Sequence, residues 1–147
     1  ARVEYARDFL RRGNEVEQMM KVVGEEGTSL DDFIVYLKGY FLDAVYLQQN
    51  SFDEVDAAVS TERQQHVFRF ILEILAAKFS FADKEEARSW FNATRQLFID
   101  YNYTVWGSDQ FKKLEKEIRA AIDEKADGMD ASVKKMLDRS EPARVAE

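Results

Sequence analysis

The run from Tyr46 to Asp56 holds the side chains best suited to binding a ligand, and it reads Tyr-Leu-Gln-Gln-Asn-Ser-Phe-Asp-Glu-Val-Asp. It combines amide side chains with one aromatic ring, Phe52, and three acids. Because an aromatic ring stacks on a flat base while amides contact its edge, the run could line a pocket for such a ligand. The other interpretation is an ordered connection that caps the preceding helix through its amides and buries Phe52 as a staple. The residue types leave both interpretations open.

Other kinds of chemistry have little support. His66 is the single histidine, one turn after Glu62, and a carboxylate-bridged metal site would need further ligand pairs on facing helices. We therefore expect His66 to be a satisfied or half-exposed side chain. No serine lies in a Gly-flanked nucleophile elbow, and no GxxxxGK[ST] phosphate loop is present. The sequence predicts no metal site and no catalytic residue, so the chain alone should be inactive.

A second polar cluster runs from Glu25 to Asp32 and holds four carboxylates, those of Glu25, Glu26, Asp31 and Asp32. A solvated and well-capped helix start accounts for it, because the helix dipole favours acids in the first turn. The alternative is a charged helix-turn-helix tip that meets a basic partner helix.

Composition limits the classes of protein that fit. At 147 residues, with 46% hydrophobic and 13% aromatic residues, the chain is expected to form one domain with a real core. The net charge of -7 argues against nucleic-acid binding, and the absence of cysteine excludes disulfides and thiolate metal sites. No apolar run approaches the roughly 20 residues of a membrane span, so direct membrane insertion is not expected. The chain starts mid-pattern without an initiator Met, and we expect it to be a piece of a longer protein.

One proline and six glycines leave few helix breakers, so long helices are expected. Helical spacing predicts a first segment over about 2–23, broken into two pieces at Gly13, with Gly24 as a C-cap. Ser29 is expected to cap a second helix that ends near Gln48, where a connection over 49–59 follows.

The Thr61-Glu62-Arg63-Gln64 segment matches a capping box, and the residues that follow over 67–75 are apolar on most sides, which predicts a central helix. Asp83 and Ser108 are expected to cap two more helices, the last with a narrow apolar stripe that places it on the outside. No period-two strand pattern competes. The sequence therefore predicts an all-α helical bundle of about five to seven helices over 1–126. A C-terminal tail over 127–147 follows, in which residues 131–137 could form a short helix.

The Tyr46–Asp56 run resembles the F/Y-L-Q-Q-N/D-A-F-x-x-V-D signature of the catalytic A (alpha) subunit of V-type, or archaeal-type, ATP synthases. Its surroundings match that family as well: Val23-Gly24 and the acidic turn precede the run, and Ser60-Thr61-Glu62-Arg63-Gln64 opens the apolar helix behind it. The resemblance covers about residues 3 to 80. Two departures are Ser51, where the family usually has Ala, and Leu42–Val45, where it often has I-R-E-D.

The resemblance implies the C-terminal helical domain of a bacterial V/A-type catalytic subunit, whose P-loop domain would lie upstream of Ala1 and bind ATP or ADP with Mg. It implies that the signature approaches the adenine, through Gln49, Asn50, Ser51 and Phe52. By position, the acidic turn corresponds to a rotor-facing loop of the related F-type beta subunit, with Glu25, Glu26, Gly27, Thr28, Ser29, Asp31 and Asp32 as the tip.

The implied partners are the upstream nucleotide-binding domain, the noncatalytic B subunit and the central stalk subunits, in a cytoplasmic complex peripheral to the membrane. The competing hypothesis is a free-standing acidic adaptor bundle whose aromatic face around Trp90 and Tyr101 binds a partner helix. A metal-carboxylate oxidase bundle lacks the ligands it would need.

Overall fold

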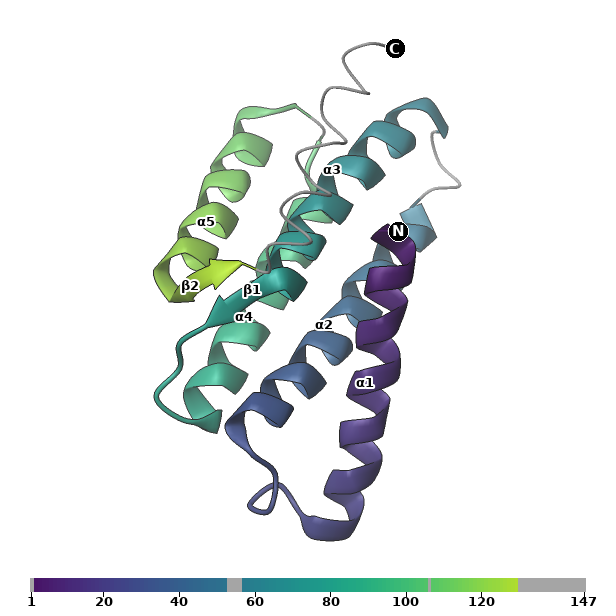
Figure 1. The fold of residues 1–147 in the computed structure, drawn as a ribbon. Coiled ribbons are helices and arrows are strands. Elements are labelled where there is room, and N and C mark those ends of the chain that lie inside the picture. Colours follow the sequence, from purple (N-terminus) through teal and green to yellow (C-terminus); the bar gives the residue numbers. More distant parts are fainter. Residues whose placement is uncertain (1, 53–56, 106, 130–147) are drawn as a thin grey trace.

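The computed structural model describes the backbone of residues 2–52, 57–105 and 107–129. Within these ranges, it describes all side chains except those of residues 2, 46–52, 57–61 and 129. Five helices and a two-stranded sheet make up the described part of the chain (Figure 1). The all-α helical-bundle prediction is confirmed, since the sheet is only a small addition.

Helices α1 (Arg2–Val23) and α2 (Leu30–Phe52) form an antiparallel hairpin. Helix α1 is unbroken, so the predicted break at Gly13 is wrong. Gly13 instead faces Gly39 of α2, and a Cβ added to Gly13 would lie 3.2 Å from the Gly39 Cα. The absent side chains let the two helix backbones approach each other, which outweighs the low helix propensity of glycine.

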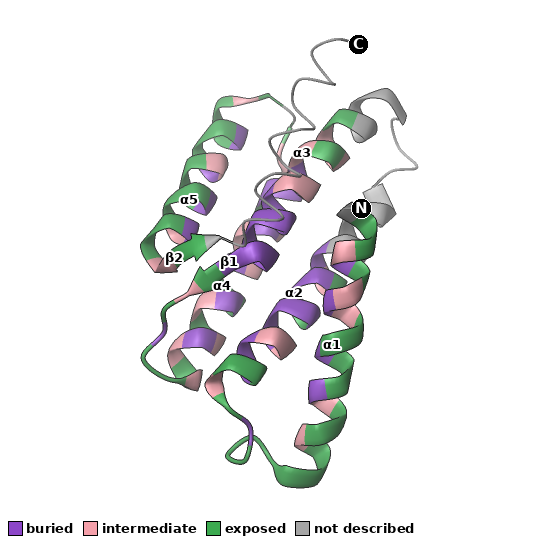
Figure 2. Ribbon diagram, in the orientation of Figure 1, coloured by how far each residue is buried: buried purple, intermediate pink, exposed green. Residues whose placement is uncertain are grey.

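Helix α3 (Ala57–Ala76) carries the central part of the core. Every side chain from Phe70 to Ala76 is buried, as the sequence predicted for a central helix (Figure 2). The start of α3 was predicted wrongly, because the helix begins at Ala57 and the Thr61–Gln64 segment lies inside it instead of capping it. Likewise α2 continues to Phe52, four residues beyond the predicted end at Gln48.

Helices α4 (Lys84–Tyr103) and α5 (Asp109–Lys125) begin at the predicted caps. The Asp83 carboxylate accepts a hydrogen bond from the Glu86 N–H at 2.8 Å, and the Ser108 hydroxyl accepts one from the Phe111 N–H at 3.2 Å. The buried side chains of α5 form one stripe, which confirms its outer position: Phe111, Leu114, Ile118 and Ile122.

A short antiparallel sheet joins the ends of α3 and α5, and the sequence analysis missed it. Strand β1 (Ala77–Phe79) pairs with β2 (Ala126–Met129), with Ala77 opposite Met129 and Phe79 opposite Ala126. Strands this short show no alternating pattern. The predicted tail thus contributes residues 127–129 to the sheet, while the rest of the tail, including the short helix considered at 131–137, lies outside the described residues.

The chain direction alternates from helix to helix, so the starts of α1, α3 and α5 and the ends of α2 and α4 lie at one end of the bundle (Figure 1). The turn between α1 and α2 lies at the opposite end. The two regions that the sequence analysis singled out are therefore at opposite ends of α2.

Candidate functional site

The backbone of Gln49, Asn50, Ser51 and Phe52 belongs to the last turns of α2. Their side chains, and residues 53–56 that complete the signature, lie outside what the structure describes. The predicted role of these residues beside an adenine therefore stays a prediction. Their location is nevertheless defined, at the end of α2 farthest from the acidic turn (Figure 1).

The acidic turn between α1 and α2 is built by local hydrogen bonds. Gly24 has a φ of +80°, as predicted for a C-cap, and its N–H donates to the Met20 carbonyl at 2.8 Å. The Thr28 hydroxyl is buried and donates to the Gly24 carbonyl at 3.0 Å. Gly27 leaves no room for a side chain, because a Cβ there would lie 2.7 Å from the Val23 carbonyl oxygen. The turn thus has a defined shape.

The four carboxylates of the turn have different surroundings. Glu26, Asp31 and Asp32 are exposed, and the Asp32 N–H donates to the predicted cap, the Ser29 hydroxyl, at 3.1 Å. Glu25 instead forms an ion pair with Arg88 of α4. Lys84 of α4 also donates to the Glu25 backbone carbonyl at 2.5 Å. The structure places five of the seven tip candidates in the turn and the other two, Asp31 and Asp32, in the first turn of α2, and it attaches the turn to α4 through Glu25.

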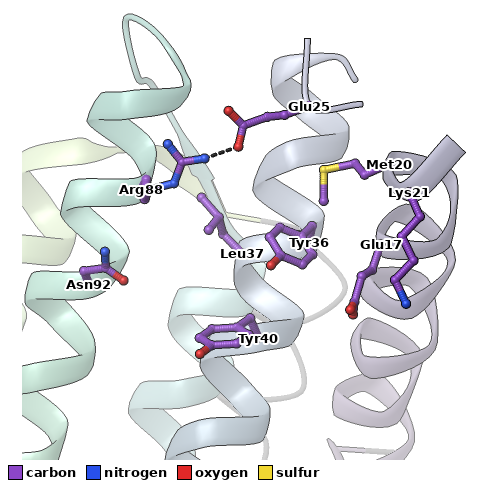
Figure 3. A pocket seen from close by; sticks show the side chains of 9 residues that line it. All are labelled: Glu17, Met20, Lys21, Glu25, Tyr36, Leu37, Tyr40, Arg88 and Asn92. Atoms are coloured by element: carbon purple, nitrogen blue, oxygen red, sulfur yellow. Dashed lines mark hydrogen bonds and ion pairs between the residues drawn. The ribbon is translucent and has the colours of Figure 1, made fainter. Parts of the chain in front are cut away.

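An open groove of about 520 Å³ runs beside this turn, between α1 and α4 and over one side of α2 (Figure 3). Met20 and Leu37 supply apolar surface, and Tyr36 and Tyr40 supply rings. Burial, followed by the charge of Glu17, raises the pKa of Tyr36 above its usual value. Sequence reasoning did not find this groove, because its walls come from three helices. It lies next to the Glu25–Arg88 pair, and its mixed polar and apolar lining carries no arrangement of groups suited to catalysis.

Lys38 is the most unusual charged residue of the described core. It is 8% exposed, and its ammonium donates to the carbonyls of Leu75 at 2.9 Å and Ala77 at 2.7 Å. These carbonyls lie where α3 ends and β1 begins, so Lys38 satisfies acceptors that the end of a helix leaves open. Burial, with a smaller contribution from Arg12, lowers the Lys38 pKa to about 8. The sequence held one sign of this unusual burial: Lys38 follows Ile34 by four positions and precedes Phe41 by three, so it lies on the apolar face of the predicted helix.

His66, Glu115 and Tyr101 form a polar cluster that joins α3, α5 and α4. Nε2 of His66 contacts the Glu115 carboxylate, and the Tyr101 hydroxyl donates to the same oxygen at 3.2 Å. Burial and the Glu115 charge raise the Tyr101 pKa well above its usual range. His66 is thus a half-exposed and satisfied histidine, as predicted.

The aromatic face of the adaptor hypothesis does not exist as a surface. Tyr101 is fully buried and stacks on Phe111, with ring centroids 4.4 Å apart. Trp90 is half-buried, and its indole N–H donates to the Ala121 carbonyl of α5 at 3.1 Å. Helix α5 covers this side of α4, so a partner helix cannot bind there without displacing it. Elsewhere among the aromatic side chains, Phe33 is buried in the core, and Tyr36 and Tyr40 line the groove.

Within the described ranges, no group of three or more His, Cys, Asp and Glu side chains could hold a metal ion. In the same ranges, no helix combines the length and apolar character needed to cross a membrane.

Comparison with known proteins gives one consistent result. The sequence model of a family described as the C-terminal domain of V and A type ATP synthase matches residues 3–86, which run from α1 into the first turn of α4. This range contains the acidic turn and the Tyr46–Asp56 run. No solved structure matches the chain significantly.

Curated relatives extend the similarity to most of the chain. The V-type ATP synthase alpha chain of Treponema denticola is 64% identical over 92% of this chain, and alpha chain 1 of Treponema pallidum is 54% identical over 86%. The alpha chain of Borrelia hermsii is 53% identical over 82%. In each case the similarity covers less than a quarter of the relative's length: 23%, 23% and 21%, respectively.

Proposed function

Because the chain belongs to the family of C-terminal domains of V- and A-type ATP synthases, we propose that it couples the nucleotide site of a catalytic alpha subunit to the rotating central stalk. The observation that carries the proposal is the 64% identity to a V-type ATP synthase alpha chain over 92% of this chain. The parent subunit would hydrolyse or synthesise ATP with Mg in the domain upstream of Ala1. It would act beside the noncatalytic B subunit, in an ion-translocating complex peripheral to the membrane on its cytoplasmic side.

The geometry of α2 supports this coupling, because one helix connects the nucleotide end of the domain to the acidic turn. The helix is continuous over 23 residues and therefore about 35 Å long. The signature residues Gln49, Asn50, Ser51 and Phe52 lie in its last turns, and the acidic turn precedes its first. A movement imposed at one end of such a helix is transmitted to the other end as a rigid-body rotation.

The exposed surface of the tip supports contact with a protein partner. Beside Glu26, Asp31 and Asp32, the end of α1 presents the exposed apolar side chains of Met19, Val22 and Val23. Apolar side chains next to carboxylates suit a partner helix that offers both apolar and basic residues, which we propose is a helix of the central stalk.

The nucleotide end is tested in the assembled parent complex with the substitution Phe52→Ala. If Phe52 stacks on the adenine, the substitution raises KM for ATP more than it lowers kcat, because the ring binds substrate without taking part in phosphoryl transfer. An unchanged KM would remove Phe52 from the site.

The 147-residue chain alone should hydrolyse no ATP, because the phosphate-binding loop belongs to the proposed upstream domain. Calorimetric titration should detect only weak nucleotide binding by this chain. Tight ATP binding would show that the pocket is complete without that domain, contrary to the proposal.

The tip is tested in the same complex by reversing two exposed charges, Glu26→Lys with Asp31→Lys. We expect ATP-driven rotation or ion pumping to fall, because the tip would then repel a basic partner. The control is Glu15→Lys, which reverses one exposed charge on α1 away from the tip. Equal effects of the two variants would argue against a specific contact at the tip.

A further inference from the structure

Lys38 joins the middle of α2 to the place where α3 ends and β1 begins. Its ammonium donates hydrogen bonds to the carbonyls of Leu75 at 2.9 Å and Ala77 at 2.7 Å. These acceptors lie 37 and 39 positions further along the chain, and the chain between passes through the whole Tyr46–Asp56 run. The bonds of Lys38 therefore close a loop of the chain that contains the signature.

The groups that hold the ammonium are neutral and come from three other elements. Besides the two carbonyls, the ring centres of Phe9 in α1 and Phe79 in β1 lie 5.5 Å and 5.3 Å from Nζ of Lys38. Aromatic rings at such distances attract a cation. The side chain is 8% exposed, so water has little access to it. The ammonium is thus held in one place by contacts with α1, α3 and β1.

Hydrogen bonds to two carbonyls align α2 with the end of α3 more strictly than apolar packing does. Packed helices slide past each other in small shear movements, because one apolar contact replaces another. A buried ammonium that leaves its acceptors loses hydrogen bonds in a place with little water, which is costly. A methionine would fill the same space without this restriction. Lys38 therefore favours one alignment of the two helices.

The bonds of Lys38 lie far from the signature and closer to the acidic turn. Helices α2 and α3 run in opposite directions, and the signature connects them (Figure 1). Lys38 lies about four helical turns before Phe52, the last residue of α2, and about two turns after Leu30, its first. The attachment is therefore in the part of the helix pair that is opposite the connection.

Two helices joined at one end by their connection can splay apart at the other end. If α2 tilted away from α3, the change in the angle between the helices would absorb a movement at the signature, and the acidic turn would stay behind. Lys38 opposes this tilt, because it attaches α2 to α3 in the part of the pair where splaying separates the helices most. With this attachment, the two helices move as one body.

We propose that Lys38 is a positioning residue for energy coupling in the parent alpha subunit, where it keeps α2 aligned with α3 while a movement at the nucleotide end reaches the acidic turn. This inference rests on the proposed function and adds the residue that keeps the movement from being lost inside the domain. Lys38 is buried between the two ends of α2, so it binds neither the nucleotide nor the stalk. Its removal should weaken coupling without changing ATP hydrolysis.

The test is ATP-driven rotation of the assembled parent complex that carries Lys38→Met. A bead attached to the central stalk reports the torque from its speed against viscous drag, and ATP hydrolysis is measured on the same preparation. We expect a loss of torque with kcat and KM for ATP unchanged, because methionine fills the space but leaves α2 free to tilt. Unchanged torque would overturn the proposal, and so would a fall in kcat/KM that matches the loss of torque.

The matched control is Arg119→Met. Arg119 of α5 donates to Glu73, a carboxylate of α3 that is 5% exposed, so this variant also removes a bond between a cation and a buried acceptor. It leaves the bonds of Lys38 in place, and its torque should equal that of the wild type. An equal loss of torque in the two variants would show that lowered stability, and not the alignment of α2, is the cause.

Hydrogen exchange in the wild-type complex gives a second measurement, which does not depend on the folding of a variant. Amide exchange over residues 75–79 is compared in the absence of nucleotide and during ATP turnover. If Lys38 keeps this junction closed throughout the movement, exchange there stays equally slow in the two conditions. Faster exchange during turnover would mean that α2 and α3 separate at this point, contrary to the proposal.

The wild-type complex separates this inference from the proposed function. ATP hydrolysis without rotation of the stalk would contradict the proposed coupling itself, whatever the behaviour of Lys38→Met. Rotation with the same torque in the wild type and in Lys38→Met would leave the proposed function intact and remove Lys38 from it.

Discussion

Gly13 of α1 and Gly39 of α2 face each other where the two helices cross. A Cβ added to Gly39 would lie 3.1 Å from the Phe9 carbonyl oxygen and 3.2 Å from the Gly13 Cα. Both neighbours are backbone atoms, which cannot move aside as a flexible side chain could. The pair therefore sets the distance between α1 and α2, and through it the position of the acidic turn that joins them.

Substitution of Gly39 by valine should destabilise the domain. The larger side chain forces α1 away from α2, and overpacking of this kind costs about 1–3 kcal/mol. The measurement is urea-induced unfolding followed by circular dichroism. Asn14→Val is the control, because it places the same β-branched residue at an exposed position of α1. Equal midpoints for the two variants would show that the crossing tolerates a side chain.

The ion pair between Glu73 of α3 and Arg119 of α5 should stabilise the packing of these helices. Glu73 is 5% exposed and also lies 3.6 Å from Nε of Arg69, while Arg119 covers the Phe70 ring at 5.1 Å. In Arg119→Met, the apolar part of the side chain is kept but a charge-assisted hydrogen bond to a buried carboxylate is lost. We expect a loss of about 1–2 kcal/mol, since Arg119 is itself partly exposed.

The control for this pair is Arg11→Met, which removes exposed ion pairs to Asp8 and Glu15 within α1. Such pairs contribute little to stability, so the melting temperature should stay close to that of the wild type. A melting temperature for Arg119→Met as high as that of Arg11→Met would mean that Arg69 alone satisfies Glu73.

Lys38 should make stability increase with pH in the alkaline range. Its pKa is about 8 in the folded protein against 10.5 ordinarily, so between these pH values the unfolded chain binds more protons than the folded one. The free energy of unfolding therefore rises with pH across this window. The contribution is fully present above 10.5 and is lost as the pH falls through about 8.

The measurement compares the free energy of unfolding of the wild type with that of Lys38→Met at several pH values. Other titrating groups are common to both proteins, so their effects cancel in the difference. We expect the difference to shift in favour of the wild type between pH 8 and 10.5. A difference that does not change with pH would show that the ammonium keeps its ordinary pKa despite its burial.

Local chemistry made some features predictable from the sequence. Ser29, Asp83 and Ser108 cap helices as expected, because each hydroxyl or carboxylate bonds to an N–H three residues ahead. The apolar residues of α3 predicted its central position, because a helix without a polar face has to be covered on all sides by other parts of the domain. The family signature pointed to Gln49–Phe52 as the adenine candidates, but they were expected in a connection after the helix, and their backbone instead belongs to the last turns of α2.

Features that depend on distant partners could not be predicted. Gly13 looks like a helix breaker until Gly39 is placed opposite it. Lys38 lies on the apolar face of its helix, but its acceptor at Leu75, 37 positions away, cannot be identified from the sequence. The Glu25–Arg88 pair spans 63 positions, and no short-range pattern indicates it. The false capping box at Thr61 shows the converse error, in which a local pattern is overridden by a helix that starts earlier.

Arg88 should hold the acidic turn against α4. Its guanidinium pairs with Glu25 and Glu85 and lies 5.1 Å from the centre of the Phe33 ring. In Arg88→Gln, we expect faster amide hydrogen exchange over residues 24–28, because the turn opens more often once this attachment is lost. Exchange in the β1–β2 sheet should be unchanged.

Lys84 still bonds to the Glu25 carbonyl in this variant, so adding Lys84→Ala should accelerate exchange further. Arg11→Gln removes ion pairs within α1 alone and is the matched control. If exchange over 24–28 is as slow in Arg88→Gln as in Arg11→Gln, the backbone bonds of the turn hold it without help from α4, and the tip does not depend on α4 for its position.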